Sequence, residues 1–419
     1  MVGRVLVLLV AALLTMGAVV PEGAPPYIAP DRTDARTALD RLTAEALRPT
    51  ASTTEVRAVA AASAPALAAV SPEPARVTRW WSRLTPAARG VLVTTAPGIV
   101  GNLEGVPYAV RDAANRAVLR DRIAAVERRL ASGAGRGEGV LLATRLRTFE
   151  QVAAALHRTP GGPPRSLITL DAESGDRAAV AIGDLDTADY VDFLVPGMYF
   201  SVEDQMVDWT DTAAAIQSQQ RAWLSRFRDA RSSAVVSWIG YRTPDVFSVA
   251  TFGLAQSGAA RLADAVNGLK QQRTGSEPYV AVLAHSYGAT AALLALKAHA
   301  FSVDALALVG AAGSPARSVH ELAVPADDVF VGEAVWDGVA TSGFFGTDPA
   351  APSYGALPLG TTGGRDPVSG AALRPAVGHN GYFAPGSESM RNLALVGIDR
   401  GGEVTSGVSA ASGALALDR

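Results

Sequence analysis

Cysteine is absent from this chain of 419 residues. Its absence excludes disulfide bonds, thiolate metal sites, cysteine nucleophiles and lipid anchors attached through a thiol. A protein without disulfides depends on its hydrophobic core, and a chain of this length with 48% hydrophobic residues can build one. We therefore expect a folded globular protein rather than a disordered chain.

Charge is also sparse. Charged residues make up 18% of the chain, the formal net charge is -3, and lysine occurs only at Lys270 and Lys297. No long basic stretch is present, so no nucleic-acid partner is predicted. The motifs HExxH and GxxxxGKS/T are missing, which argues against a zinc-dependent hydrolase and a nucleotide-binding P-loop. We predict no cofactor and no metal.

The first residues have the layout of a secretory signal. Arg4 precedes an apolar run from Val5 to Val20, which Pro and Gly then interrupt. The run is shorter than the ~20 residues that a membrane-spanning helix needs, but no small-x-small cleavage site follows it. Residues 1–24 are therefore either a signal peptide or a membrane anchor. Both alternatives predict an extracytoplasmic protein, secreted or associated with the cell envelope through its N-terminus.

The chain up to about residue 158 is rich in helix formers. Leu119, Ile123, Val126 and Leu130 are separated by four, three and four residues, so they lie on one face of a predicted helix. The glycine-rich stretch 131–139 is predicted to be a loop, and Trp80 and Trp81 are predicted to be packing anchors. We expect a helical N-terminal region over residues 25–158, an α/β domain over 159–400 and a flexible tail over 401–419.

Short apolar runs alternate with helical segments in the second half of the chain. The predicted strands are residues 167–171, 179–183, 191–196, 234–240, 279–285, 305–310 and 329–335. The predicted helices between them include residues 212–228, 259–270 and 289–299. Nearly continuous apolar strands separated by helices predict an α/β fold with a mostly parallel sheet that is covered by helices on both faces.

The most informative motif lies where the strand 279–285 runs directly into a helix through Ser286. Small residues, Ala284 and Gly288, stand two places before and after this serine. A nucleophile elbow needs small residues there, because the serine occupies a sharp turn in which strand and helix pass close together. Ala284 replaces the first glycine of the G-x-S-x-G pattern. The alternative is a serine that only caps the following helix.

A serine nucleophile needs a base, and the elbow predicts the order serine, acid, histidine along the chain. His379 stands in a Gly- and Pro-rich loop after all the predicted strands, whereas the competing His320 precedes the last of them. The other histidines are His157, which precedes the serine, His285, which should point away from the position of a triad partner, and His299, which closes the next helix. We expect His379 Nε2 within ~2.6–3.2 Å of the Ser286 hydroxyl.

Asp337 follows the last predicted strand and is our choice for the acid of the triad, with Asp348 as the rival and Glu333 as a weaker third. The oxyanion hole of such a site combines the amide after the nucleophile with one from the loop after the third strand. Those amides belong to Tyr287 and Met198.

Several longer segments, taken together, resemble a known family. They are residues 79–116, 191–198, 235–245, 284–289 and 378–394. They are similar to an actinobacterial α/β-hydrolase family that is catalogued as a domain of unknown function. The resemblance implies an α/β-hydrolase fold with a helical N-terminal extension, and it matches Ser286 and His379 to the family's site.

These features lead to one main hypothesis about function. The chain is expected to be an exported serine hydrolase of esterase or lipase type that acts on a small-molecule or lipid-like ester, or an amide, through a Ser286-Asp337-His379 triad and an acyl-enzyme. One alternative is a non-catalytic α/β-hydrolase-like binding protein of the cell envelope. Another is an acyltransferase with the same triad. The sequence carries no prediction of oligomeric state.

Overall fold

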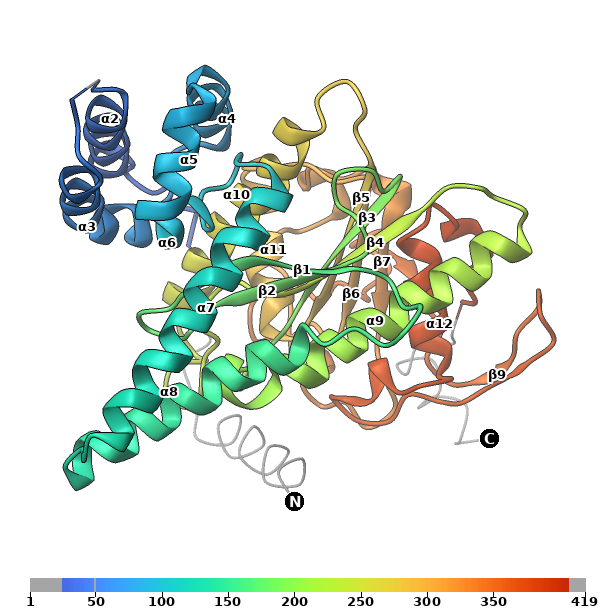
Figure 1. Cartoon of the computed structure of the whole chain (residues 1–419). Helices are drawn as coiled ribbons and strands as arrows, with labels where there is room; N and C mark the ends of the chain where they lie inside the picture. The colour runs from blue at the N-terminus through green and yellow to red at the C-terminus, as the bar shows by residue number, and fades with distance from the viewer. Residues whose placement is uncertain (1–24, 49, 407–419) are drawn as a thin grey trace, which may run out of the picture.

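The computed structural model describes residues 25–48 and 50–406 (Figure 1). The predicted signal peptide or membrane anchor over residues 1–24 lies outside these residues. Within the described part, no helix combines the length and the apolar character needed to cross a membrane.

An eight-stranded sheet forms the centre of the fold, in the order β1-β2-β4-β3-β5-β6-β7-β8. Strand β2 is antiparallel to both of its neighbours, whereas the strands from β4 to β8 are mutually parallel. The bounds are β1 Arg165–Leu170, β2 Ala178–Ile182, β3 Tyr190–Val195, β4 Ser233–Ile239, β5 Tyr279–His285, β6 Ala305–Val309, β7 Val329–Gly332 and β8 Leu357–Pro358. The predicted mostly parallel sheet is confirmed.

Helices cover both faces of this sheet (Figure 1). They are α7 Tyr108–Ala131, α8 Arg136–Ala155, α9 Val202–Arg226, α10 Gly253–Gln272, α11 Tyr287–Lys297 and α12 Glu388–Val396. Successive side chains of a strand point to opposite faces. Phe193 and Val282 thus join the core beneath α10 and α11, while Leu194 and Leu283 join the core shared with α7, α8, α9 and α12.

The first helices form a bundle with a separate core beside the sheet (Figure 1). They are α2 Thr33–Leu47, α3 Thr53–Ala69, α4 Pro74–Arg83, α5 Pro86–Thr95 and α6 Pro97–Val100. Trp80 and Trp81 are buried in this core, with ring centroids 5.8 Å apart, which confirms their role in packing. The bundle meets the α/β domain where α4 packs on α10 and where Arg32 pairs with Asp264 at 2.9 Å.

Four predicted boundaries are wrong. Helix α10 begins at Gly253 rather than at residue 259. Helix α8 begins at Arg136, so the predicted loop over residues 131–139 is shorter, because the glycines at its end are tolerated in the first helical turn. Helix α9 begins at Val202 rather than at residue 212, because the Ser201 hydroxyl caps it by accepting from the Asp204 amide at 3.0 Å. Strand β7 ends at Gly332, after which the chain leaves the sheet.

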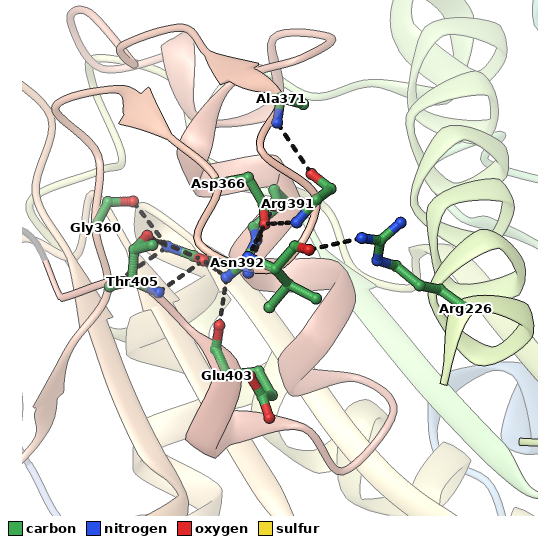
Figure 2. A network of polar contacts seen from close by, with 10 residues as sticks. Arg226, Gly360, Asp366, Ala371, Arg391, Asn392, Glu403 and Thr405 are labelled. Carbon is green, nitrogen blue, oxygen red and sulfur yellow. Dashed lines mark hydrogen bonds and ion pairs between the residues drawn. The ribbon is translucent and has the colours of Figure 1, made fainter. Parts of the chain in front are cut away.

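A buried polar network joins α12 to the last described residues (Figure 2). Arg391 Nε donates to Asp366 Oδ2 at 2.8 Å, and Arg391 Nη1 donates to the Glu403 carbonyl at 2.5 Å. Asn392 Nδ2 donates to the Gly360 carbonyl at 3.1 Å and to the Thr405 hydroxyl at 2.9 Å. The chain is therefore held in place as far as Thr405, and residues 407–419 of the predicted flexible tail lie outside the described residues.

Asp192 is an acid buried inside the sheet, on β3, where its carboxyl group accepts a hydrogen bond from the Gln220 amide. Burial raises its pKa well above the usual value. A raised pKa in the folded state contributes stability below the unfolded value of about 3.9, and this stability is lost as the pH rises through the folded pKa. The substitution Asp192→Asn should therefore become more favourable as the pH increases.

Thermal and urea unfolding of wild type and Asp192→Asn at pH 4.5 and pH 8 measures this effect. We expect the variant to gain stability relative to the wild type as the pH rises from 4.5 to 8, because only the wild type has a carboxyl at this position that ionises more readily unfolded than folded. Other carboxyls cancel in this comparison because both proteins carry them. A stability difference that does not change with pH would contradict the assignment of a protonated Asp192.

Candidate active site

Ser286 occupies a strained turn between β5 and α11, with φ 55 and ψ -128. A non-glycine residue at positive φ is uncommon and usually marks a functional constraint. The small residues Ala284 and Gly288 leave room for this turn between the strand and the helix. A Cβ on Gly288 would lie 2.5 Å from the Pro196 carbonyl oxygen, and Ala284 is fully buried beside Val195. This is the local geometry expected of the elbow.

His379 lies between Ser286 and Asp337. Its Nε2 is 2.7 Å from Ser286 Oγ, and its Nδ1 is 3.0 Å from each carboxylate oxygen of Asp337. A carboxylate can only accept, so the Nδ1 proton points to Asp337 and Nε2 is free to accept from the serine hydroxyl. The arrangement can move the hydroxyl proton to the imidazole and stabilise the imidazolium that results.

The Asp337 carboxylate is buried and held by several donors. The Tyr382 hydroxyl donates to it at 2.5 Å, and the amides of Val339 and Ala340 donate at 3.0 and 3.2 Å. Burial would raise the pKa of Asp337, but the hydrogen bonds from His379, Tyr382 and Ala340 outweigh it and hold the pKa below its usual value. Asp337 is therefore ionised at neutral pH.

The structure brings Asp337, not Asp348, against His379. Asp348 instead accepts from the Ala350 amide at 2.8 Å in its own turn. Glu333 is half-buried nearby, where burial, followed by the charges of Asp348 and Asp337, raises its pKa to about 7. His320 is exposed on a short 3-10 helix.

The loops that carry the acid and the base are joined next to the site. Val335 forms a β-bridge with Val377, and the Gly378 amide donates to the Val335 carbonyl at 2.8 Å. Between this bridge and Asp337 stands Trp336, which has φ 65 and is 83% exposed. The turn at Trp336 directs the Asp337 side chain inward and leaves a large apolar side chain in solvent.

The loop after β3 runs beside the nucleophile. A Cβ on Gly197 would lie 2.5 Å from Ser286 Cβ, so only glycine allows this approach. The amide of Met198 follows directly, and the amide of Tyr287 belongs to the first turn of α11, whose N–H groups have no intrahelical acceptor. Within the part of the chain that the structure describes, neither amide donates to a protein acceptor, so both can receive a developing oxyanion.

The segment after β4 holds this loop in place, a role that the sequence did not reveal. The Tyr241 hydroxyl donates to the Pro196 carbonyl at 2.8 Å, and the Thr243 hydroxyl donates to the Phe200 carbonyl at 2.7 Å. The Tyr199 amide, in a residue with φ 64, donates to the Pro244 carbonyl at 3.0 Å. The loop that carries the Met198 amide is thus positioned by the segment that follows β4.

A cavity of about 330 Å³ lies between α8, the β1–β2 turn and the starts of the segments that follow β3 and β4. Its lining includes Arg145, Phe149, Phe200 and Arg242. The Phe200 ring, which lines the cavity, also packs near His285, with ring centroids 6.5 Å apart. Among residues 25–48 and 50–406, no group of three or more His, Asp or Glu side chains could hold a metal ion.

His285 was expected to point away from the position of a triad partner, and His379, not His285, contacts the Ser286 hydroxyl and Asp337. The His285 ring nevertheless contacts the loop that carries His379. Its Nε2 lies 2.8 Å from the main-chain carbonyl oxygen of His379. The two imidazole rings have centroids 4.8 Å apart. The sequence position beside Ser286 suggested no such contact, because the partner is supplied by a loop far along the chain.

Comparison with known proteins gives a consistent result. Residues 171–346 match a family model described as alpha/beta hydrolase. Two proteins of Mycobacterium tuberculosis, from strains H37Rv and CDC 1551 and both described as uncharacterized, are each 30% identical to this chain over 378 residues. The similarity covers 79% of this chain and 56% of each relative, so the chain spans little more than half of their length.

Proposed function

Because the chain has an α/β-hydrolase fold and residues 171–346 match the alpha/beta hydrolase family model, we propose that it is a serine hydrolase that cleaves an ester or amide bond through an acyl-enzyme. In this proposal Ser286 is the nucleophile, His379 is the general base and acid, and Asp337 orients the imidazole. The contact that carries the proposal is the 2.7 Å approach of His379 Nε2 to the hydroxyl of a serine at positive φ.

The proposed reaction has two halves. Ser286 Oγ attacks the carbonyl carbon while its proton passes to His379 Nε2, and the amides of Tyr287 and Met198 stabilise the oxyanion. The imidazolium then protonates the leaving group as the bond to it breaks, which gives the acyl-enzyme. Water, deprotonated by the same imidazole, attacks the acyl group, and the second oxyanion collapses with return of the proton to Ser286 Oγ.

We further propose an extracytoplasmic location and a small-molecule or lipid-like substrate. The location rests on the signal-like layout of residues 1–24. The apolar character of the substrate is supported by the exposed side chains of Trp336 and Val377, which are 83% and 56% accessible on the loops that carry Asp337 and His379. Exposed apolar groups beside a reactive site are typical of contact with apolar ligands.

Labelling with a fluorophosphonate, read by intact mass, tests the proposed nucleophile. We expect one adduct on the wild-type protein and none on Ser286→Ala, because the probe reacts only with a hydroxyl that has been activated by a base. A matched control is Ser302→Ala, which removes an exposed serine just before the start of β6, whereas Ser286 follows the end of the neighbouring parallel strand β5.

The control variant should label like the wild type. An adduct that persists on Ser286→Ala would show that another residue is the nucleophile. A folded wild-type protein that forms no adduct at any probe concentration would favour a binding protein over an enzyme.

A further inference from the structure

His285 is the last residue of β5 and is 2% exposed. Its Nε2 contacts the His379 carbonyl oxygen at 2.8 Å. The loop around that carbonyl is open to solvent, since Val377 and Asn380 on either side are both exposed. Within residues 25–48 and 50–406, this is the one hydrogen bond that the main chain of His379 forms.

We infer that His285 is a positioning residue for the proposed reaction, whose Nε2–H holds the main chain of His379 and so fixes the imidazole between Ser286 and Asp337. The inference rests on the proposed function. This hydrogen bond links the strand that carries the nucleophile to the loop that carries the base, because His285 directly precedes Ser286 on the central strand β5, whereas His379 lies on a surface loop.

The protonation of His285 suits this role. A carbonyl oxygen can only accept, so Nε2 carries the ring proton and Nδ1 does not. Burial, with a smaller contribution from the neighbouring His379, lowers the pKa of His285 to about 3. The ring therefore stays neutral, and it adds no positive charge beside His379 when that residue becomes an imidazolium.

The packing around His285 indicates that its imidazole N–H, and not only its ring volume, is needed at this position. Its ring is surrounded by the rings of Phe200, Tyr382 and Phe383, with centroid distances of 6.5, 5.9 and 5.7 Å. Its Nδ1 is buried and has no hydrogen-bond partner among the described residues. A buried unpaired polar atom is unfavourable and rare in folded proteins. A phenylalanine would fill the same space without this penalty, but it could not hold the His379 carbonyl.

Hydrolysis of p-nitrophenyl butyrate by the full-length protein tests the inference, with His285→Phe and His285→Gln compared with the wild type. Phenylalanine keeps the ring volume and removes the donor, whereas the glutamine amide nitrogen can replace Nε2–H. We expect His285→Phe to lower kcat by about 10- to 100-fold with little change in KM, because a small displacement of a catalytic group costs this much. We expect His285→Gln to retain kcat within about threefold of the wild type.

Thermal unfolding and the fluorophosphonate labelling rate accompany the kinetics, and His320→Phe is the matched control at an exposed histidine. A wild-type kcat in folded His285→Phe, or an equal loss in the phenylalanine and glutamine variants, would overturn the inference. If His285→Phe does not fold, His285→Asn takes its place. Its shorter side chain cannot reach the carbonyl, so a kcat equal to that of His285→Gln would also overturn it.

If the proposed function itself were wrong, these experiments would give a different set of results. In that case the wild-type protein itself would neither label nor hydrolyse the ester, and the inference would fall with it. A wild type that labels, together with an unaffected His285→Phe, would refute only the role of His285.

Discussion

Asp337→Asn is expected to lower kcat for ester hydrolysis by about 10⁴-fold while leaving the fold intact, which is the size of the effect for the same change in a serine protease triad. The reason lies in the donors around the carboxylate. Val339 and Ala340 donate to Oδ1, so the oxygen of an asparagine would stay with them and its NH₂ group would replace Oδ2. That group would donate to His379 Nδ1, force the ring proton onto Nε2, and prevent Nε2 from accepting the Ser286 proton.

Steady-state hydrolysis of p-nitrophenyl butyrate, with Ser286→Ala as the baseline, measures this loss. Asp348→Asn is the matched control, because Asp348 caps its own turn and does not contact His379. It should stay within about threefold of the wild type, as expected for a surface change away from the site. If Asp348→Asn lost activity while Asp337→Asn kept it, the acid would have to be reassigned.

Asp366→Asn is expected to destabilise the protein by about 3–5 kcal/mol, because it leaves Arg391 charged and buried without its partner. The side chains of Arg391 and Asp366 are only 4% and 1% exposed in the network of Figure 2. Burial would raise the pKa of Asp366, but Arg391 and the amides of Ser369 and Val368 hold it below the usual value. The stabilisation is therefore present above the unfolded pKa and is lost as the pH falls through the folded pKa.

Equilibrium unfolding in urea at pH 7 measures the loss in Asp366→Asn. The matched control is Glu138→Gln, which breaks the exposed Arg129–Glu138 pair, with a 2.5 Å contact and side chains that are 47% and 44% exposed. It should cost less than about 1 kcal/mol. Equal losses in the two variants would show that the buried network contributes no more than a surface ion pair.

The sheet and the elbow could be predicted because their signals are local. The strands are short apolar runs, and the elbow depends on small residues at fixed distances from Ser286. The start of α9 could also have been found. Val202, Met206 and Trp209 are all buried and are spaced by four and three residues, but the acidic residues between them obscured this pattern.

The sequence favoured Asp337 as the acid but left Asp348 as a rival. Asp337 and Asp348 both lie in Gly- and Pro-rich segments after β7, and the structure distinguishes them through a left-handed turn at Trp336. Nothing in the sequence predicts positive φ for a tryptophan, which adopts it far less readily than glycine or asparagine. The contact of His285 was missed for a similar reason, since it depends on a loop 94 residues away.

The distance along the chain between Ser286 and His379 has a consequence for biosynthesis. The imidazole lies 93 residues after the serine, and beyond the segment over residues 171–346 that matches the family model. A nascent chain that has formed only the strands up to β6 carries the serine but lacks the group that would activate it. If Ser286 is the nucleophile, as we propose, its reactivity would arise only after the His379 loop has docked against it. For a chain bound for export, as we propose, the serine would stay inert during synthesis and transit.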